Sequence, residues 1–186
     1  MSIAIARHRF TWDEYHKMAE TGILAPTQRV ELIEGEIVDR TPIGHRHVAC
    51  VARLNYAFVR GVGDRAVLFV QSPIRLADHS EPEPDLVVLR PRADFYARRA
   101  AGPRDVLLMI EVADTSEHYD RHVKVPLYAR YGIPEVWLVD LMAGSVTAYR
   151  QPGAEGYEQT IVATGHDELR PLAFPDLVVT AASILA

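Results

Sequence analysis

Hydrophobic and polar positions along the chain repeat with two different periods. Apolar residues recur at helical spacing over residues 46–60, and this segment ends before Gly61. Short apolar runs of strand length occupy residues 66–71, 73–77, 84–89 and 107–112. The pattern therefore predicts an α/β protein in which a helix precedes a series of strands.

Local signals mark the N-terminal elements. Thr11 and Glu14 form a capping box, which predicts a helix that starts there and stops near Gly22. Residues 29–38 are typical of a hairpin that turns at Glu34-Gly35, with helix as the alternative for the first half.

A second helix and a parallel strand are predicted in the C-terminal half. Pro126 is tolerated only in a first turn, so the helix should begin at residues 122–124 and end at Gly132. The buried-strand pattern of residues 133–140 follows after a short turn, which favours a parallel step. A closing hairpin is predicted at 146–150 and 157–163. The expected architecture is a mixed central β-sheet flanked by helices.

Composition narrows the possible classes of protein. A length of 186 residues suffices for one core, and no long linker is present, so we expect a single domain over residues 1–186. The one cysteine, Cys50, excludes an intramolecular disulfide and a multi-cysteine zinc site, and we expect it to be a small buried hydrophobe. The net charge of −5 argues against a generally basic nucleic-acid binder, although a local basic strip remains compatible with it.

The chain shows no sign of membrane insertion or secretion. Its apolar stretches are far shorter than the roughly 20 residues that cross a bilayer. The first ten residues lack the ordered regions of a secretory signal. We therefore expect a cytoplasmic protein with no membrane partner.

Two carboxylates stand on neighbouring apolar runs. Asp85 opens the run at 84–89, and Glu111 lies near the end of the run at 107–112. Antiparallel pairing of these strands would bring both carboxylates to the same end of a sheet. A buried carboxylate such as Glu111 is costly unless it is paired or bound to metal. With Lys124 as a nearby ammonium, the group suggests a hydrolase that uses Mg²⁺ or Mn²⁺ to cleave phosphodiester bonds.

The pentapeptide Pro-Asp-Leu-Val-Val occurs twice, at 84–88 and at 175–179. The residues after Asp176 include neither an acid nor a lysine that could complete a site. We therefore expect Asp176 to be a turn residue before a last strand or helix, and Asp85 to belong to the functional copy.

Several short motifs follow one another across most of the chain: Phe10–Tyr15, Glu31–Glu36, His47, Gln71, Pro84-Asp85, Glu111-Val112, Asp120 with Lys124 and Tyr128, and Gly132–Asp140. In order and spacing they resemble the Uma2 branch of the PD-(D/E)XK nuclease superfamily, whose members are restriction-endonuclease-like. The resemblance implies a restriction-endonuclease-like fold with Asp85 and Glu111 as metal ligands.

The lysine departs from the superfamily pattern. Its usual position is two residues after the second acid, where this chain has Ala113. The resemblance implies that the lysine has moved to the following helix, at Lys124. Asp120 would then be a charge-assisted partner that orients Lys124.

Three further residues are candidates for supporting roles. Glu31 resembles the family's acidic position in the first hairpin and would complete the metal shell, with an exposed hairpin glutamate as the alternative. His47 is expected near the site, with helix capping or a surface position as the alternative. Gln71 ends a strand and is a candidate for binding backbone or substrate.

The one concentrated basic segment lies between the two acidic strands. It contains Arg90, Arg92, Arg98 and Arg99, interleaved with Phe95 and Tyr96. We expect it to contact nucleic-acid phosphates near the metal, with a solvated arginine-rich loop as the alternative. Restriction-like nucleases often pair subunits to cut two strands, so the resemblance also implies a homodimer.

Three functional hypotheses remain open at this point. The first is a Mg²⁺-dependent DNA endonuclease with Asp85, Glu111 and Lys124 as its catalytic residues. The second is a non-catalytic nuclease-fold module that acts with a protein partner, in which Lys124 would be turned away from the acids. The third is a glycosidase that uses a carboxylate pair without metal.

Overall fold

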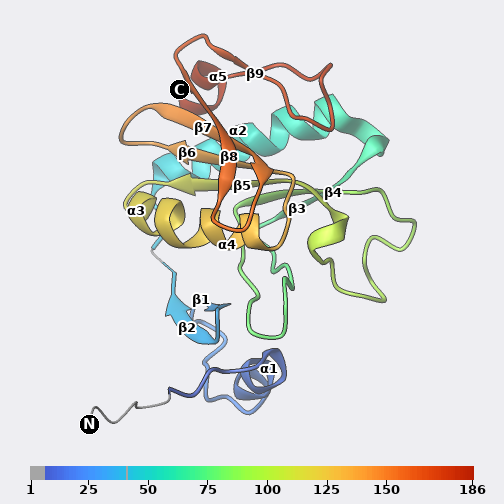
Figure 1. The fold of residues 1–186 in the computed structure, drawn as a ribbon, viewed down its shortest axis with the longest axis vertical. Coiled ribbons are helices and arrows are strands. Elements are labelled where there is room, and N and C mark those ends of the chain that lie inside the picture. The colour runs from blue at the N-terminus through green and yellow to red at the C-terminus, as the bar shows by residue number, and fades with distance from the viewer. Residues whose placement is uncertain (1–6, 41) are drawn as a thin grey trace.

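The computed structural model describes residues 7–40 and 42–186, so the expectations for residues 1–6 and Thr41 lie outside the described part. Its centre is a six-stranded sheet in the order β3-β4-β5-β6-β7-β8 (Figure 1). The strands are β3 (Val67–Val70), β4 (Leu86–Leu89), β5 (Val106–Ala113), β6 (Glu135–Asp140), β7 (Ser145–Pro152) and β8 (Tyr157–Thr164). Only the pair β5 and β6 is parallel. The predicted mixed sheet, with its parallel step and closing hairpin, is confirmed.

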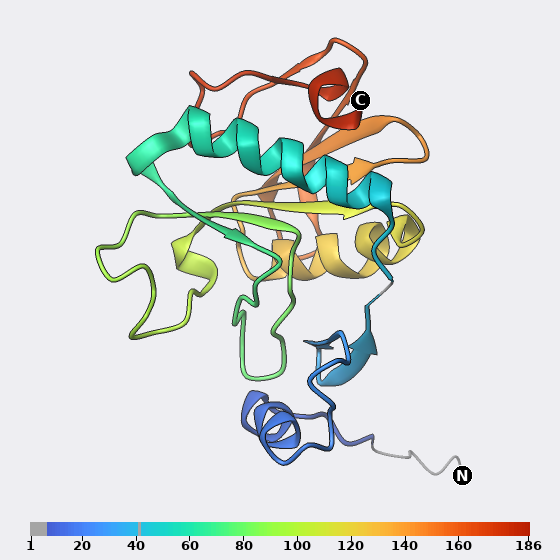
Figure 2. The same ribbon diagram turned by 180° about the vertical axis from the view of Figure 1, so that it is seen from behind.

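Helices cover both faces of this sheet (Figures 1 and 2). Helix α2 (His45–Val62) packs with the side chains of Leu86 and Val88 on one face. On the other face, Val87 and Leu89 pack with α4 (Val125–Arg130). All four residues of β4 are fully buried, which explains why its sequence is a continuous apolar run rather than an alternating one.

The predicted burial of Cys50 is also confirmed. Its side chain lies on the core-facing side of α2, and burial raises the pKa of the thiol to about 12. A thiol in this state is a small hydrophobe rather than a nucleophile.

The N-terminal elements form as the sequence predicts. Helix α1 (Trp12–Glu20) starts at Thr11, and the capping box with Glu14 is present. Strands β1 (Val30–Ile33) and β2 (Glu36–Asp39) pair antiparallel around Glu34 and Gly35, whose φ angles of 50° and 82° suit a type I′ turn. The helical alternative for residues 29–33 is therefore wrong.

The hairpin is attached to the rest of the molecule through the loop that precedes β4. Glu81 donates its backbone N–H to the carbonyl of Leu32 at 2.7 Å, and Gly35 donates to the carbonyl of His79 at 2.7 Å. Figure 2 shows α1 and the hairpin beyond this loop, at the opposite end of the molecule from β9 and α5. The contacts connect the hairpin directly to the segment that leads into Asp85.

Two predicted elements differ from the structure. Residues 73–77 do not form a strand, because the backbone N–H groups of Ile74 and Leu76 bond to carbonyls within their own loop, at Pro82 and Ser80. The helix expected at 122–132 instead begins at Glu117, as α3 (Glu117–Tyr119), a π-helical turn η3 (Asp120–Lys124) and then α4.

The π-helical turn explains the second difference. Val125 donates its N–H to the carbonyl of Asp120, five residues back, so the hydrogen-bond ladder is already shifted when the chain reaches Pro126. Pro126 lacks a donor, yet the chain stays helical on both sides of it.

Short elements complete the fold: η1 (Gly63–Arg65), η2 (Pro103–Asp105), β9 (Glu168–Leu169), β10 (Val179–Thr180) and α5 (Ala181–Leu185). Within the described residues, no helix combines the length and the apolar character that a bilayer span requires.

Candidate active site

Asp85 and Glu111 meet at one end of the sheet. Leu86 pairs with Ile110 in the antiparallel register of β4 and β5, so Asp85, just before β4, lies beside Glu111. Both acids are almost fully buried, with relative exposures of 4% and 2%. The predicted juxtaposition of the two carboxylates is confirmed.

Asp85 is held by three donors from separate elements. Its Oδ2 accepts hydrogen bonds from His47 Nε2 at 3.1 Å and from the backbone N–H of Val112 at 2.9 Å. Its Oδ1 accepts from Gln71 Nε2 at 3.2 Å. Burial by itself raises the pKa of Asp85, but the hydrogen bonds from His47, Val112 and Gln71 outweigh it and leave the pKa below its ordinary value. Asp85 is therefore a fixed carboxylate.

The local backbone positions the side chains of His47 and Gln71 against Asp85. His47 lies in the first turn of α2, and because Nε2 faces a carboxylate, that nitrogen carries the proton. Its other nitrogen, Nδ1, is buried without a hydrogen-bond partner among the described residues. Gln71 has a φ of 44°, rare for a residue with a side chain, and its backbone N–H donates to the carbonyl of Asp85 at 3.1 Å. Both candidates thus lie against Asp85.

Glu111, next to Asp85, has its own partners, Tyr128 and Lys124, and Lys124 also reaches Glu31. Its Oε1 accepts a short hydrogen bond from the hydroxyl of Tyr128 and lies 3.1 Å from Lys124 Nζ. Burial raises the pKa of Glu111 to about 8, against the attraction of Lys124. Within the described chain its Oε2 has no hydrogen bond, so that oxygen remains available to a cation.

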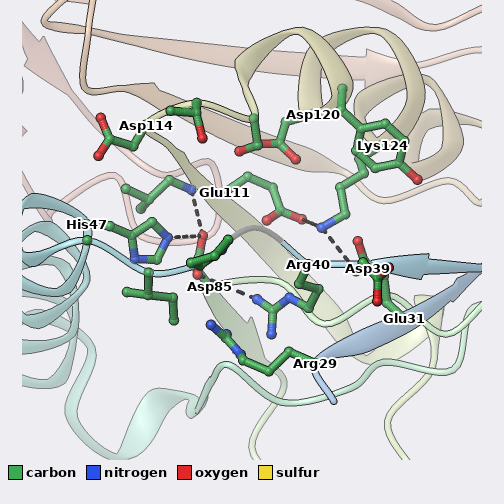
Figure 3. A pocket seen from close by; sticks show the side chains of 17 residues that line it. Arg29, Glu31, Asp39, Arg40, His47, Asp85, Glu111, Asp114, Asp120 and Lys124 are labelled. Atoms are coloured by element: carbon green, nitrogen blue, oxygen red, sulfur yellow. Dashed lines mark hydrogen bonds and ion pairs between the residues drawn. The ribbon is translucent and has the colours of Figure 1, made fainter. Parts of the chain in front are cut away.

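Lys124 points back to the sheet, as its position in the sequence suggested. Its Nζ lies 3.1 Å from Glu111 and 3.2 Å from Oε2 of Glu31 (Figure 3). Burial lowers the pKa of Lys124, but the two carboxylates outweigh burial and raise it above its ordinary value. The side chain is therefore an ammonium that bridges two acids.

Glu31 is not the exposed hairpin glutamate of the alternative interpretation. It has a relative exposure of 4%, and besides Lys124 it accepts a hydrogen bond from the backbone N–H of Glu83 at 3.1 Å. The expected direct pairing of Asp120 with Lys124 is wrong. Asp120 lines the same pocket, but its Oδ2 accepts from Ser116 Oγ at 2.6 Å, while Lys124 is already bracketed by Glu31 and Glu111.

Acidic side chains outnumber basic ones in the pocket. Six carboxylates line it, against three side chains that are always basic: Glu31, Asp39, Asp85, Glu111, Asp114 and Asp120 against Arg29, Arg40 and Lys124. Burial raises the pKa of Glu111, so this carboxyl favours a positive partner, either a proton or a cation, and the acidic pocket suits a bound cation.

A cation in this pocket would have few protein ligands rather than an all-protein cage. Among residues 7–40 and 42–186, no group of three or more His, Cys, Asp or Glu donors is arranged to hold a metal. Mg²⁺ keeps several waters and typically uses one or two carboxylates together with substrate phosphates. Asp85 and Glu111 supply two such carboxylates.

Comparison with known proteins identifies the family and the fold of the chain. Residues 12–182 match the Uma2 family, described as "Putative restriction endonuclease". The chain belongs to the Uma2 family. The crystal structure of a "putative nuclease belonging to DUF820" from Anabaena variabilis is similar over 95% of this chain and 97% of that chain, with a TM-score of 0.74 and 20% identity. This likeness confirms the fold, and no curated protein matches the chain.

The basic segment of this Uma2 chain is not where we expected it. Arg90 follows the last residue of β4, whereas Asp85 precedes its first residue, so the segment starts at the opposite end of the strand, roughly 17 Å away. Arg92 pairs with Asp94 at 2.6 Å, and Arg99 pairs with Asp105 at 3.0 Å. The expected proximity of this segment to the metal ligands is therefore wrong.

Two arginines line the pocket and were not identified from the sequence. Arg29 and Arg40 flank the first hairpin, and Arg40 pairs with Glu83 and lies 3.9 Å from Oδ1 of Asp85. Their only signal in the sequence is their place just outside the paired hairpin residues, next to the acidic motif at Glu31. Isolated arginines of this kind do not stand out against the cluster at 90–104.

Proposed function

We propose that this chain is a metal-dependent endonuclease that hydrolyses phosphodiester bonds of DNA, with Mg²⁺ or Mn²⁺ held by Asp85 and Glu111. One observation carries the proposal: a fixed carboxylate, a second buried carboxylate and the Lys124 ammonium meet at one end of the sheet. The descriptions of the Uma2 family, "Putative restriction endonuclease", and of the similar protein from Anabaena variabilis, "putative nuclease", support the reaction class.

Of the two acids that would hold the cation, Asp85 is fixed more firmly than Glu111. His47, Gln71 and Val112 orient Asp85, whereas Glu111 is tied through Oε1 alone, to Tyr128 and Lys124. When bound, a divalent cation lowers the pKa of a coordinated water and offsets charge on the phosphate. The acids therefore supply the negative charge that attracts the ion, and their partners keep that charge in place.

Lys124 acts as a donor rather than as a base. Because Glu111 and Glu31 keep it protonated, it has three N–H donors and no acceptor, so it cannot take a proton from water; two of the donors face the two acids. Its ammonium can stabilise an oxygen that gains charge as the phosphodiester bond breaks. The contact of Lys124 with Glu111 favours this function over a non-catalytic module, for which we expected Lys124 to be turned away.

The homodimer is part of the same proposal. A single site of this kind cuts one strand, so cleavage of both strands is most direct with two subunits. Analytical ultracentrifugation of the purified protein, with and without duplex DNA, measures the assembly, and a chain that stays monomeric while cutting both strands would remove this part.

Cleavage and metal binding together test the proposal. Wild-type protein is expected to nick or linearise plasmid DNA in MgCl₂ or MnCl₂ but not in EDTA, and Glu111→Gln should lose this activity. Glu168→Gln is the matched control, because Glu168 is an exposed carboxylate paired with Arg170 at the far side of the fold. Calorimetric titration with Mn²⁺ should show a site that Glu111→Gln weakens, and full cleavage by this variant would refute the assignment.

A further inference from the structure

Two arginines face each other at the open end of the first hairpin. Arg29 directly precedes β1 and Arg40 directly follows β2, next to the paired residues Val30 and Asp39. The backbone N–H of Arg40 donates to the carbonyl of Arg29 at 2.8 Å, so the two residues are cross-strand neighbours. Both line the acidic pocket, and Figure 3 shows both guanidinium groups on the same side of Asp85.

The two guanidinium groups differ in their partners. Arg40 is fixed by its ion pair with Glu83 and by Asp85 at 3.9 Å. Arg29 has no ion pair and no side-chain hydrogen bond to any residue that the structure describes. Like charges opposite each other across strands are destabilising, so an anion beside Arg29 and Arg40 would relieve an unfavourable contact.

The hairpin directs Arg29 toward the site. Side chains two residues apart on a strand share a face, so Arg29 lies on the same face as Glu31, whose carboxylate reaches Lys124. A guanidinium group matches the geometry of a phosphate and can donate two parallel hydrogen bonds to it. In a pocket with an excess of carboxylates, such a donor offsets the repulsion that a polyanion would meet.

We infer that Arg29, next to Arg40, binds a backbone phosphate of the nucleic acid beside the pair Asp85 and Glu111. The inference rests on the proposed nuclease function and adds a substrate-binding residue to it. It also replaces the segment Arg90–Arg104, at the opposite end of β4, as the phosphate contact nearest to the acids.

Metal-free DNA binding tests the inference without relying on cleavage. Fluorescence anisotropy of a labelled DNA duplex in EDTA, over a series of salt concentrations, should show wild-type binding that Arg29→Gln weakens by roughly tenfold. The slope of log affinity against log salt should fall by about 1, as for the loss of one phosphate contact. Arg60→Gln is the matched control, since Arg60 is an exposed arginine in the last turn of α2, at the end of that helix away from His47, and it should leave both quantities unchanged.

Two further readouts separate a phosphate contact from a structural role. Arg29→Lys keeps the charge but not the paired donors, so it should keep the salt slope and lose part of the affinity. In cleavage assays Arg29→Gln should raise KM and leave kcat nearly unchanged. Thermal melting followed by circular dichroism checks that the variants fold.

The possible outcomes distinguish the inference from the proposed function. Wild-type protein that binds DNA through Arg29 but never cleaves it would refute the nuclease and leave the phosphate site standing. Cleavage by a protein whose Arg29→Gln variant binds with unchanged affinity and slope would refute the phosphate site alone. Absence of DNA binding by the wild type, or an equal or larger loss in Arg60→Gln, would also overturn it.

Discussion

The pentapeptide Pro-Asp-Leu-Val-Val occupies two very different regions of the molecule. At 84–88 it leads into β4, inside the six-stranded sheet, and its Asp85 is 4% exposed. At 175–179 it leads into β10, which pairs only with the short strand β9, and the side chain of Asp176 is 61% exposed. Both copies place Pro-Asp before extended chain, but only Pro175-Asp176 forms a turn, so Asp176 is the turn residue that we expected.

The two aspartates differ in the residues that approach them from elsewhere in the chain. Asp85 receives donors from α2, from the end of β3 and from β5, through His47, Gln71 and Val112. Asp176 has one partner, Arg65, at 2.9 and 3.0 Å, which lowers the pKa of its carboxyl at the surface. The pentapeptide thus determines only the local backbone geometry. Asp85 is a candidate metal ligand because residues from distant parts of the chain donate hydrogen bonds to it.

The strongest test of this difference replaces each aspartate by its neutral isostere. Asp85→Asn should lower metal-dependent DNA cleavage by at least about 10³-fold, or about 4 kcal/mol, because it removes a charged ligand without changing the shape. Asp176→Asn should leave the rate within about twofold, as expected for a surface carboxylate away from the pocket. Initial rates of oligonucleotide cleavage in MgCl₂ measure both. Equal losses in the two variants would show that the copies do not differ in function.

Ion pairs in the two regions should differ in their effect on stability. Lys124→Met leaves Glu31 and Glu111 buried without their cation and should lower the free energy of unfolding by about 3–5 kcal/mol. Arg65→Gln breaks the exposed pair with Asp176 and should lower it by no more than about 1 kcal/mol. Equilibrium urea denaturation of both variants measures the difference. A loss below about 1 kcal/mol for Lys124→Met would argue against a buried ion-pair network.

Much of the site could be predicted because it depends on strand patterns. Asp85 opens one apolar run of strand length and Glu111 lies near the end of another, and antiparallel pairing suffices to bring them together. Strand direction also explains the wrong expectation for Arg90, since a segment that follows β4 must emerge at the end opposite Asp85. That expectation treated sequence proximity as spatial proximity.

Other features depend on tertiary contacts that no local pattern encodes. The π-helical turn before Pro126 brings Lys124 to Glu111, and the proline alone predicted a later helix start. The burial of Glu31 depends on how the hairpin docks on the loop before β4, through contacts between residues far apart in the sequence.

The donors to Asp85 provide a finer test of the comparison. His47→Leu removes the hydrogen bond to Oδ2 and should reduce Mn²⁺ affinity or cleavage by about 10- to 100-fold, as for residues that orient a metal ligand. His47→Gln, whose amide can still donate, should recover part of the loss. His45→Leu is the matched control, because His45 is an exposed histidine in the same helical turn. Calorimetry with Mn²⁺ measures the affinities, and equal values for His47→Leu and wild type would remove His47 from the site.

The smallest effects are expected at the fourth position of each copy, where Val87 is fully buried and Val178 is 40% exposed. Thr has nearly the shape of Val, so the substitution tests desolvation of a hydroxyl rather than packing. Val87→Thr places that hydroxyl in the core between β4 and α4 and should lower the free energy of unfolding by about 1–3 kcal/mol. Val178→Thr can keep its hydroxyl in water and should change stability by no more than about 0.5 kcal/mol. Urea denaturation measures the free energy of unfolding of both variants. Similar losses would mean that Val178 is as deeply buried as Val87. Burial could then not explain why only Asp85 accepts hydrogen bonds from distant residues.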